Sequence, residues 1–88
     1  MKVEFRNSFE RDLRRIRDQA IKERIKTVIE QIEKVNDLTE ASNVRKLRGG
    51  ENHYRVRIGD YRLGLLLNEG TVVFVRCLPR QDIYRYFP

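Results

Sequence analysis

Residues 46–67 read KLRGGENHYRVRIGDYRLGLLL, and this stretch decides the fold. Two segments of alternating character flank Gly59-Asp60, and a Gly-X pair between such segments is typical of a two-residue turn that closes a β-hairpin. The register predicted by this turn pairs Ile58 with Tyr61, Arg57 with Arg62, Val56 with Leu63, and Arg55 with Gly64.

Because side chains alternate along a strand, the predicted hairpin has two different faces. Like charges directly opposite each other destabilise a sheet by roughly 0.2–1 kcal/mol per pair, so stability alone does not favour Arg57 opposite Arg62. We interpret the arginine face as an anion site suited to a nucleic-acid backbone. The alternative is an ordinary solvated face that is rich in arginine. One face carries Tyr54, Val56, Ile58, Tyr61, Leu63 and Leu65, and the other carries Arg55, Arg57 and Arg62 around Gly64.

Length and composition indicate one small domain. The 88 residues predict a single domain spanning 1–88. The single cysteine, Cys77, excludes an internal disulfide and falls in an apolar segment, where a buried structural thiol is expected. With no apolar run near the ~20 residues that span a bilayer, the sequence predicts a soluble, cytoplasmic protein.

The positive charge is concentrated in the second half of the chain. The net charge is +6, of which residues 1–44 contribute +1 and residues 45–88 contribute +5. A basic balance of this kind points to nucleic acid, an anionic membrane or an acidic protein partner. Membrane binding is the least favoured, because the basic residues fall on predicted strands and not on an amphipathic helix.

The first half of the chain predicts a strand and two helices. Residues 2–6 alternate as a short strand, and Asn7-Ser8 is the expected N-cap of a first helix. After a second cap or bend at Asp18, a helical apolar stripe runs from Ile21 to Val35. The helices form a hairpin or one bent helix. The stripe packs against the sheet or, alternatively, forms a dimer seam. Residues 36–42 read as a polar connector.

The last part of the chain predicts the fourth strand of the sheet and a short tail. A three-residue loop at Asn68-Glu69-Gly70 would put Val73, Val75 and Cys77 on the core face. It would leave Leu66, Val72, Phe74 and Arg76 on the arginine face, as an apolar patch that needs a cover. Pro79 then begins a short helix or tail. The predicted fold class is α+β, in the order β-α-α-β-β-β. An N-terminal helical hairpin packs on a mostly antiparallel four-stranded sheet.

In this order and in so short a chain, four segments resemble the RelE/ParE superfamily of toxins from type II toxin–antitoxin modules. They are KLRG (46–49), YRVRIGDYRL (54–63), TVVFV (71–75) and PRQDIYRYF (79–87). The resemblance covers nearly the whole chain. It implies an antitoxin partner, and RelE-like members cleave mRNA in the ribosomal A site whereas ParE-like members poison DNA gyrase.

The resemblance also implies a set of site residues. RelE-like ribonucleases carry basic residues two apart before the tight turn, an arginine after it, another after the last strand, and a C-terminal tyrosine. The matching positions are Arg55, Arg57, Arg62, Arg80 and Tyr84, with Tyr86 as the alternative tyrosine. The chain departs from the pattern in having arginines where the best-known ribonuclease has lysines. It also has Pro79 where several relatives have histidine.

Metal-independent RNA cleavage uses the 2′-hydroxyl as nucleophile, and we expect Arg57, Arg62 and Arg80 to stabilise the transition-state charge. Arginine is a poor general base, so Tyr84 is the candidate base, because neighbouring positive charge favours a phenolate. The residues expected to contact RNA are Lys46, Arg48, Arg55, Arg76, Arg85 and Tyr86. No His, Cys and carboxylate cluster stands at ligand spacing, so we expect no metal and no cofactor. His53, the only histidine, falls on the arginine face and is expected to be incidental, with contact to RNA as the alternative.

Three functional hypotheses follow. The leading one is a ribosome-dependent mRNA endonuclease toxin that a cognate antitoxin neutralises, with the 70S ribosome and mRNA as its other partners. The second is a non-enzymatic, ParE-like gyrase poison that uses the same residues only as a contact surface. The third is a catalytically decayed member that only binds its antitoxin. The antitoxin is expected to cover the patch of Leu66, Val72 and Phe74 or the helices.

Overall fold

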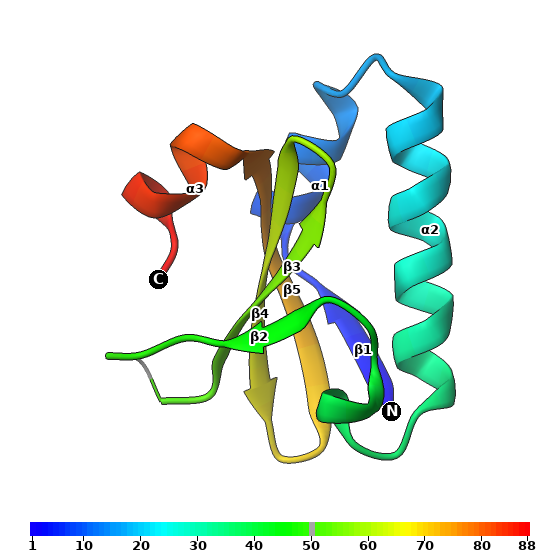
Figure 1. Ribbon diagram of the computed structural model, residues 1–88, viewed down its shortest axis with the longest axis vertical. Helices are drawn as coiled ribbons and strands as arrows, with labels where there is room; N and C mark the ends of the chain where they lie inside the picture. The colour runs from blue at the N-terminus through cyan, green and yellow to red at the C-terminus, as the bar shows by residue number, and fades with distance from the viewer. Residues whose placement is uncertain (50) are drawn as a thin grey trace.

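The computed structural model describes residues 1–49 and 51–88. A sheet lies between α1 and α2 on one side and the short helix α3 on the other (Figure 1). In chain order the elements are β1 (Lys2–Phe5), α1 (Asn7–Arg14), α2 (Gln19–Lys34), the 3₁₀ helix η1 (Leu38–Glu40), β2 (Val44–Lys46), β3 (His53–Ile58), β4 (Tyr61–Asn68), β5 (Thr71–Pro79) and α3 (Arg80–Tyr86).

The sheet has five strands in the order β1-β5-β4-β3-β2. Strand β1 runs parallel to β5, and the other pairs are antiparallel. The predicted α+β class and mostly antiparallel sheet are therefore confirmed, with one strand more than the four expected. The additional strand is β2, whose Val44 and Arg45 pair with Val56 and Arg55 of β3. Three residues are too few for an alternating pattern to be recognised in the sequence.

The two N-terminal helices cover the core face of the sheet. They are separate helices, and Asp18 caps α2 by accepting hydrogen bonds from the backbone N–H groups of Ala20 (2.9 Å) and Ile21 (3.4 Å). Ile25 and Ile32 of the apolar stripe are 2% and 0% exposed within the monomer, so the stripe packs against the sheet. These two residues are therefore not available to form a dimer seam. The connector 36–42 also contributes to the core through the buried Leu38.

The expected N-cap at Asn7-Ser8 is wrong, because α1 already includes these residues. Strand β5 continues past the end of β1, and α1 provides hydrogen-bond partners for its open edge. Ser8 Oγ donates to the Val75 carbonyl at 2.6 Å, and the Asp12 carboxylate accepts from the Cys77 N–H at 2.9 Å. Side chains of α1 thus replace a neighbouring strand. Cys77 itself is buried as expected, and burial raises the pKa of its thiol to about 12.

The turn between β4 and β5 differs from the prediction. It contains two residues, Glu69 and Gly70, with φ of 48° and 81°, and it pairs Asn68 with Thr71 and Leu65 with Phe74. The predicted three-residue loop is therefore wrong. A left-handed conformation costs a residue such as Glu69 roughly 1–2 kcal/mol, whereas burying a large apolar side chain stabilises by about 1.5–3 kcal/mol.

The shorter turn moves two apolar residues to the core face. Val72 and Phe74 are fully buried beneath the helices, so the predicted apolar patch on the arginine face, and an antitoxin covering it there, are wrong. A bulge between Gly64 and Leu65 then shifts the register by one residue. As a result Cys77 lies on the core face, as expected, and Arg76 pairs with Gly64 on the opposite face.

The C-terminal segment forms the helix α3, which was one of the two predicted forms. It packs on the face of the sheet that α1 and α2 leave free, with Ile83 and Phe87 in a small cluster beside Leu47 and Leu78. Within residues 1–49 and 51–88, no helix combines the length and apolarity needed to cross a membrane.

Candidate functional site

The arginine face of the hairpin forms a hollow between β2, β3, β4 and α3. Arg57 stands directly opposite Arg62, as predicted, and Arg45 stands directly opposite Arg55. The hollow has a volume of about 350 Å³. Two pairs of like charges therefore face each other across neighbouring strands, an arrangement that weakens a sheet. The lining residues are Asn43, Val44, Arg45, Arg55, Arg57, Arg62 and Tyr84.

Arg62 is the most constrained of these arginines. Its side chain is only 8% exposed, and its Nη1 donates to the carbonyls of Gly59 (2.7 Å) and Tyr61 (2.9 Å). Burial lowers the pKa of Arg62, and the charges of Arg57 and Arg80 lower it further. The side chain remains a cation, because arginine does not deprotonate in proteins. The β3–β4 turn therefore fixes a guanidinium in place without neutralising it.

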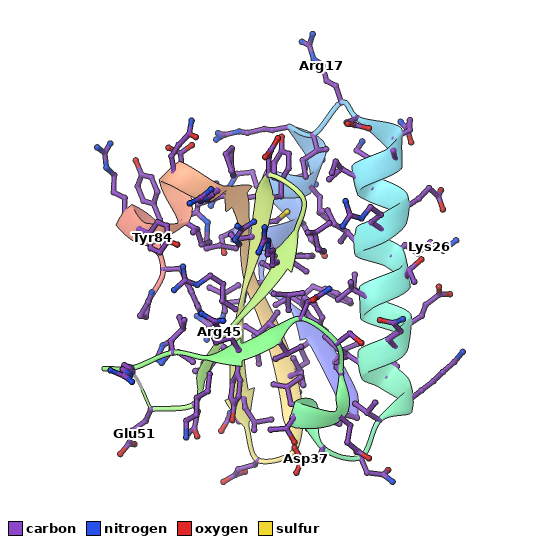
Figure 2. The ribbon with its side chains drawn as sticks, in the orientation of Figure 1. Arg17, Lys26, Asp37, Arg45, Glu51 and Tyr84 are labelled. Carbon is purple, nitrogen blue, oxygen red and sulfur yellow. The ribbon has the colours of Figure 1, made fainter. Side chains whose placement is uncertain are left out.

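Helix α3 brings Tyr84 to the same hollow and places the charge of Arg80 near Arg62. Tyr84 is 63% exposed, and the Cζ atom of Arg55 lies 4.5 Å from the centre of its ring. Arg80 begins the helix, where its N–H donates to the Asp60 carbonyl at 2.7 Å. This bond ties the start of α3 to the β3–β4 turn. Figure 2 shows Tyr84 on the side of the sheet that faces away from α2.

A second hollow adjoins the first and shares Arg45, Arg55 and Tyr84 with it. Its volume is about 690 Å³. Lys46 and Arg48, both predicted to contact RNA, line it and are exposed to solvent. The two hollows together form one basic surface from the β3–β4 turn to the segment after β2. The remaining lining residues are Leu47, Phe87 and Pro88.

Three predicted RNA contacts lie outside both hollows. Arg76 is paired with the buried Asp12, with Nε–Oδ2 at 2.8 Å and Nη2–Oδ1 at 3.2 Å. The ring of Tyr86 lies 5.3 Å from the guanidinium of Arg76. Arg85 is exposed on α3. The structure therefore groups Arg55, Arg57, Arg62 and Tyr84, with Arg80 adjacent, and separates Arg76, Tyr86 and Arg85 from them.

Sequence reasoning missed Arg45, which lines both hollows. Its position was assigned to no strand, so its pairing with Arg55 was not anticipated. The strand that carries Arg45 has only three residues, too few for the sequence to indicate it. Figure 2 shows Arg45 on β2, on the same side of the sheet as Tyr84.

His53 lies beneath the C-terminus. Its ring is 5.4 Å from that of Phe87, and its Nδ1 is buried without a hydrogen-bond partner among residues 1–49 and 51–88. His53 lines neither of the two hollows.

The charges that line the two hollows are not neutralised by neighbouring acids. In the part of the chain that the structure describes (1–49 and 51–88), the one ion pair within 4.0 Å joins Arg76 to Asp12. The lining arginines therefore keep their capacity to bind an external anion. The fork of a guanidinium suits bidentate contact with phosphate oxygens. Several such groups along one surface fit a chain of phosphates better than a single small anion.

A small α+β fold with a five-stranded sheet and an arginine-lined face under a C-terminal helix defines the class of RelE/ParE-type toxins. The family model for the "ParE toxin of type II toxin-antitoxin system, parDE" matches residues 3–84. The chain belongs to this family, and it is a RelE-like toxin of a type II toxin–antitoxin module.

Individual relatives agree with this assignment. The chain is 40% identical to Toxin RelE3 of Methanocaldococcus jannaschii over the full length of both proteins. It is similar to the crystal structure of the RelB-RelE antitoxin-toxin complex from Methanococcus jannaschii, with 38% identity, a TM-score of 0.82, and coverage of 96% of this chain and 98% of that one. It shares its fold with the archaeal RelE-RelB complex from Pyrococcus horikoshii, with 24% identity, a TM-score of 0.73, and coverage of 90% and 93%.

Proposed function

We propose that this toxin is a ribosome-dependent endoribonuclease that cleaves mRNA in the A site and is neutralised by a cognate antitoxin. The observation that carries the proposal is the hollow in which Arg57, Arg62 and Tyr84 converge without a neutralising carboxylate. The complexes of RelE with RelB from Methanococcus jannaschii and Pyrococcus horikoshii support the antitoxin as partner.

The proposed reaction is a transesterification. The 2′-oxygen of one nucleotide attacks the adjacent phosphorus, the bond to the 5′-oxygen of the next nucleotide breaks, and a 2′,3′-cyclic phosphate and a 5′-hydroxyl result. Tyr84 accepts the proton of the 2′-hydroxyl, and Arg80 donates a hydrogen bond to the leaving oxygen, which takes up a proton from solvent. Arg57 and Arg62 stabilise the additional negative charge of the pentavalent transition state.

The fixed position of Arg62 suits this role. A donor that is already aligned needs no reorganisation when charge develops, which makes electrostatic stabilisation effective. The two carbonyls of the β3–β4 turn hold its Nη1 in place. The remaining N–H groups of the guanidinium are the ones available to the phosphate.

The sparse acid–base chemistry of the site is the reason to invoke the ribosome. Tyrosine is the one proton acceptor in the first hollow, where every other ionisable lining group is an arginine. A ribosome that orients the substrate can contribute about 7–11 kcal/mol toward the barrier through positioning. We therefore expect cleavage on programmed ribosomes and little cleavage of free RNA.

The test is cleavage of a defined mRNA by the purified toxin, with and without ribosomes stalled at a known codon. Cuts at that codon only in the presence of ribosomes support the proposal, and Arg80→Ala is expected to abolish them while the fold is retained. Efficient cutting of naked RNA, or no cutting on ribosomes, contradicts it.

The description of the matching family as ParE toxin supports inhibition of DNA gyrase as a second candidate function. On this hypothesis the arginine face is a protein contact surface and no bond is cleaved. The two functions separate in cells that express the toxin. Rapid arrest of precursor incorporation into protein supports the nuclease, whereas DNA damage with continuing translation supports the gyrase poison.

A further inference from the structure

A row of residues crosses the sheet directly beneath α3. Strand pairing places Arg55 opposite Gly64 and Gly64 opposite Arg76. Both arginines reach upward to tyrosines of α3, Arg55 to Tyr84 at 4.5 Å and Arg76 to Tyr86 at 5.3 Å from the ring centres. The helix therefore rests on two guanidinium groups with a glycine between them. We call the row of Arg55, Gly64 and Arg76 the α3 seat.

The glycine in the seat receives the ring of Phe87. A Cβ atom at Gly64 would lie 2.6, 2.7 and 2.8 Å from three ring carbons of Phe87, closer than van der Waals contact allows. Gly64 lies within β4 and its φ is not in the left-handed region, so its backbone does not require glycine. The close approach of Phe87 is the feature that requires it.

Contacts with the seat and with neighbouring apolar residues hold α3 in place. The helix has seven residues, and a helix this short is not stable in isolation. Ile83 and Phe87 belong to a small apolar cluster with Leu47 and Leu78, separate from the main core beneath α1 and α2. Arg76, at one end of the seat, is held in place by two hydrogen bonds to the buried Asp12 carboxylate.

We propose that Gly64 and Phe87 are positioning residues, which set the place of Tyr84 over the arginine face and take no part in the proposed bond cleavage themselves. This inference rests on the proposed function, in which Tyr84 accepts a proton. Phe87 follows Tyr84 by three residues, so its ring in the seat fixes the last turn of α3. A displacement of about 1 Å at a reacting group can lower a rate by ~10²-fold. Arg57 and Arg62 belong to the sheet and do not move with α3, and Arg80 at the start of the helix is held by its N–H bond to the Asp60 carbonyl.

The test compares Phe87→Ala with the control Phe5→Ala, which removes a phenylalanine from the opposite side of the sheet. Phe5 is 42% exposed and packs on Phe9 and Phe74, two residues of the main core on the opposite face of the sheet from the seat. The position of Tyr84 is read by NMR, because its ring current shifts the Arg55 side-chain signals upfield. In Phe87→Ala we expect this shift to be lost and the single-turnover rate on ribosomes to fall by ~10- to 100-fold, a larger change than that in the apparent affinity. Phe5→Ala keeps both.

Two further variants check that the seat itself is responsible. Gly64→Ala places a methyl group against the ring and is expected to reproduce both effects of Phe87→Ala. Phe87→Leu keeps an apolar side chain above Gly64 and is expected to recover part of the rate and of the Arg55 shift. If Phe87 only stabilised the fold, Phe87→Ala would lower the free energy of unfolding and leave the Arg55 signals unchanged.

The outcomes separate this inference from the proposed function. Unchanged Arg55 signals in Phe87→Ala overturn the positioning role, whatever the rate. A lost shift with an unchanged rate overturns it as well, because Tyr84 then needs no fixed place. Full cleavage by Tyr84→Ala overturns instead the catalytic assignment of Tyr84. The Arg55 signals of Phe87→Ala would still show whether Phe87 holds Tyr84 in place.

Discussion

The face of the sheet beneath α1 and α2 and the face beneath α3 are made by alternate residues of the same strands. The first is continuous apolar packing, from Phe9 and Ile25 on the helices to Leu65 and Phe74 on the strands. The second holds four arginines in directly opposed pairs and one small apolar cluster under α3. The apolar face stabilises the fold. The arginine face destabilises it, because it holds like charges close together without neutralising them.

The largest effect that tests this comparison is expected from Arg62→Ala. Removing one preorganised donor of this kind lowers a rate by ~10²–10³-fold, so we expect that loss in ribosome-dependent cleavage. The main core does not include Arg62, and thermal unfolding should show a folded protein. Arg17→Ala is the matched control, since Arg17 projects from the loop between α1 and α2, away from the site (Figure 2). Equal losses in the two variants would contradict a local role for Arg62.

Leu65→Ala probes the other face. Leu65 is fully buried in the main core, and such truncations destabilise by about 2–5 kcal/mol. We expect denaturant unfolding to show this loss. The folded fraction should cleave at the normal rate, because Leu65 lines neither hollow. A large fall in the rate per folded molecule would mean that the two faces are not separable.

A pH titration gives a smaller effect, again from the core face. Burial raises the pKa of Cys77 from 9.0 to about 12. Above pH 9 the unfolded chain releases this proton and the native state keeps it, so the free energy of unfolding falls by ~1.4 kcal/mol per pH unit toward pH 12. Below pH 9 the thiol contributes no slope. Chemical unfolding at pH 8, 9 and 10 measures the effect, and Cys77→Ala should reduce the slope above pH 9 relative to the native sequence.

The smallest expected effect has the opposite sign. Arg57→Thr removes the like-charge pair with Arg62, and we expect the free energy of unfolding to rise by roughly 0.2–1 kcal/mol. Cleavage should fall, because a phosphate contact is lost. A more stable but less active protein sharpens the comparison, since it shows that the arginine face is kept at a cost to the fold. A destabilised Arg57→Thr would contradict the repulsion between Arg57 and Arg62.

Much of this contrast was accessible from the sequence, because the Gly59-Asp60 turn sets the pairing of Arg57 with Arg62. Alternation along the strands and the helical apolar stripe were strong enough to predict both N-terminal helices and four of the five strands. The turn at Glu69-Gly70 was not accessible, because Asn68 and Glu69 suit loops of either length. One residue of difference there decided whether Phe74 lay in the core or on the surface.

The site was predictable to the extent that the hairpin was. Arg55, Arg57 and Arg62 share a face by alternation alone, and Tyr84 was placed with them by family resemblance. Arg45 was missed because a three-residue strand carries too little pattern. Arg76 shares the face with the other arginines, yet its charge is taken up by Asp12, 64 residues away in the sequence. An ion pair between residues so far apart in the sequence depends on how α1 crosses β5, and no local sequence pattern indicates that crossing.

The crossing of α1 over β5 has a consequence for how the sheet meets other chains. Where β1 stops, Ser8 and Asp12 occupy the backbone groups of β5 at Val75 and Cys77. An extended segment from another molecule therefore finds these backbone groups of β5 already hydrogen-bonded. Strand addition at this edge would first have to displace the buried Asp12 carboxylate. The outer margins of β1 and β2 are left as the places where a foreign strand can join this sheet.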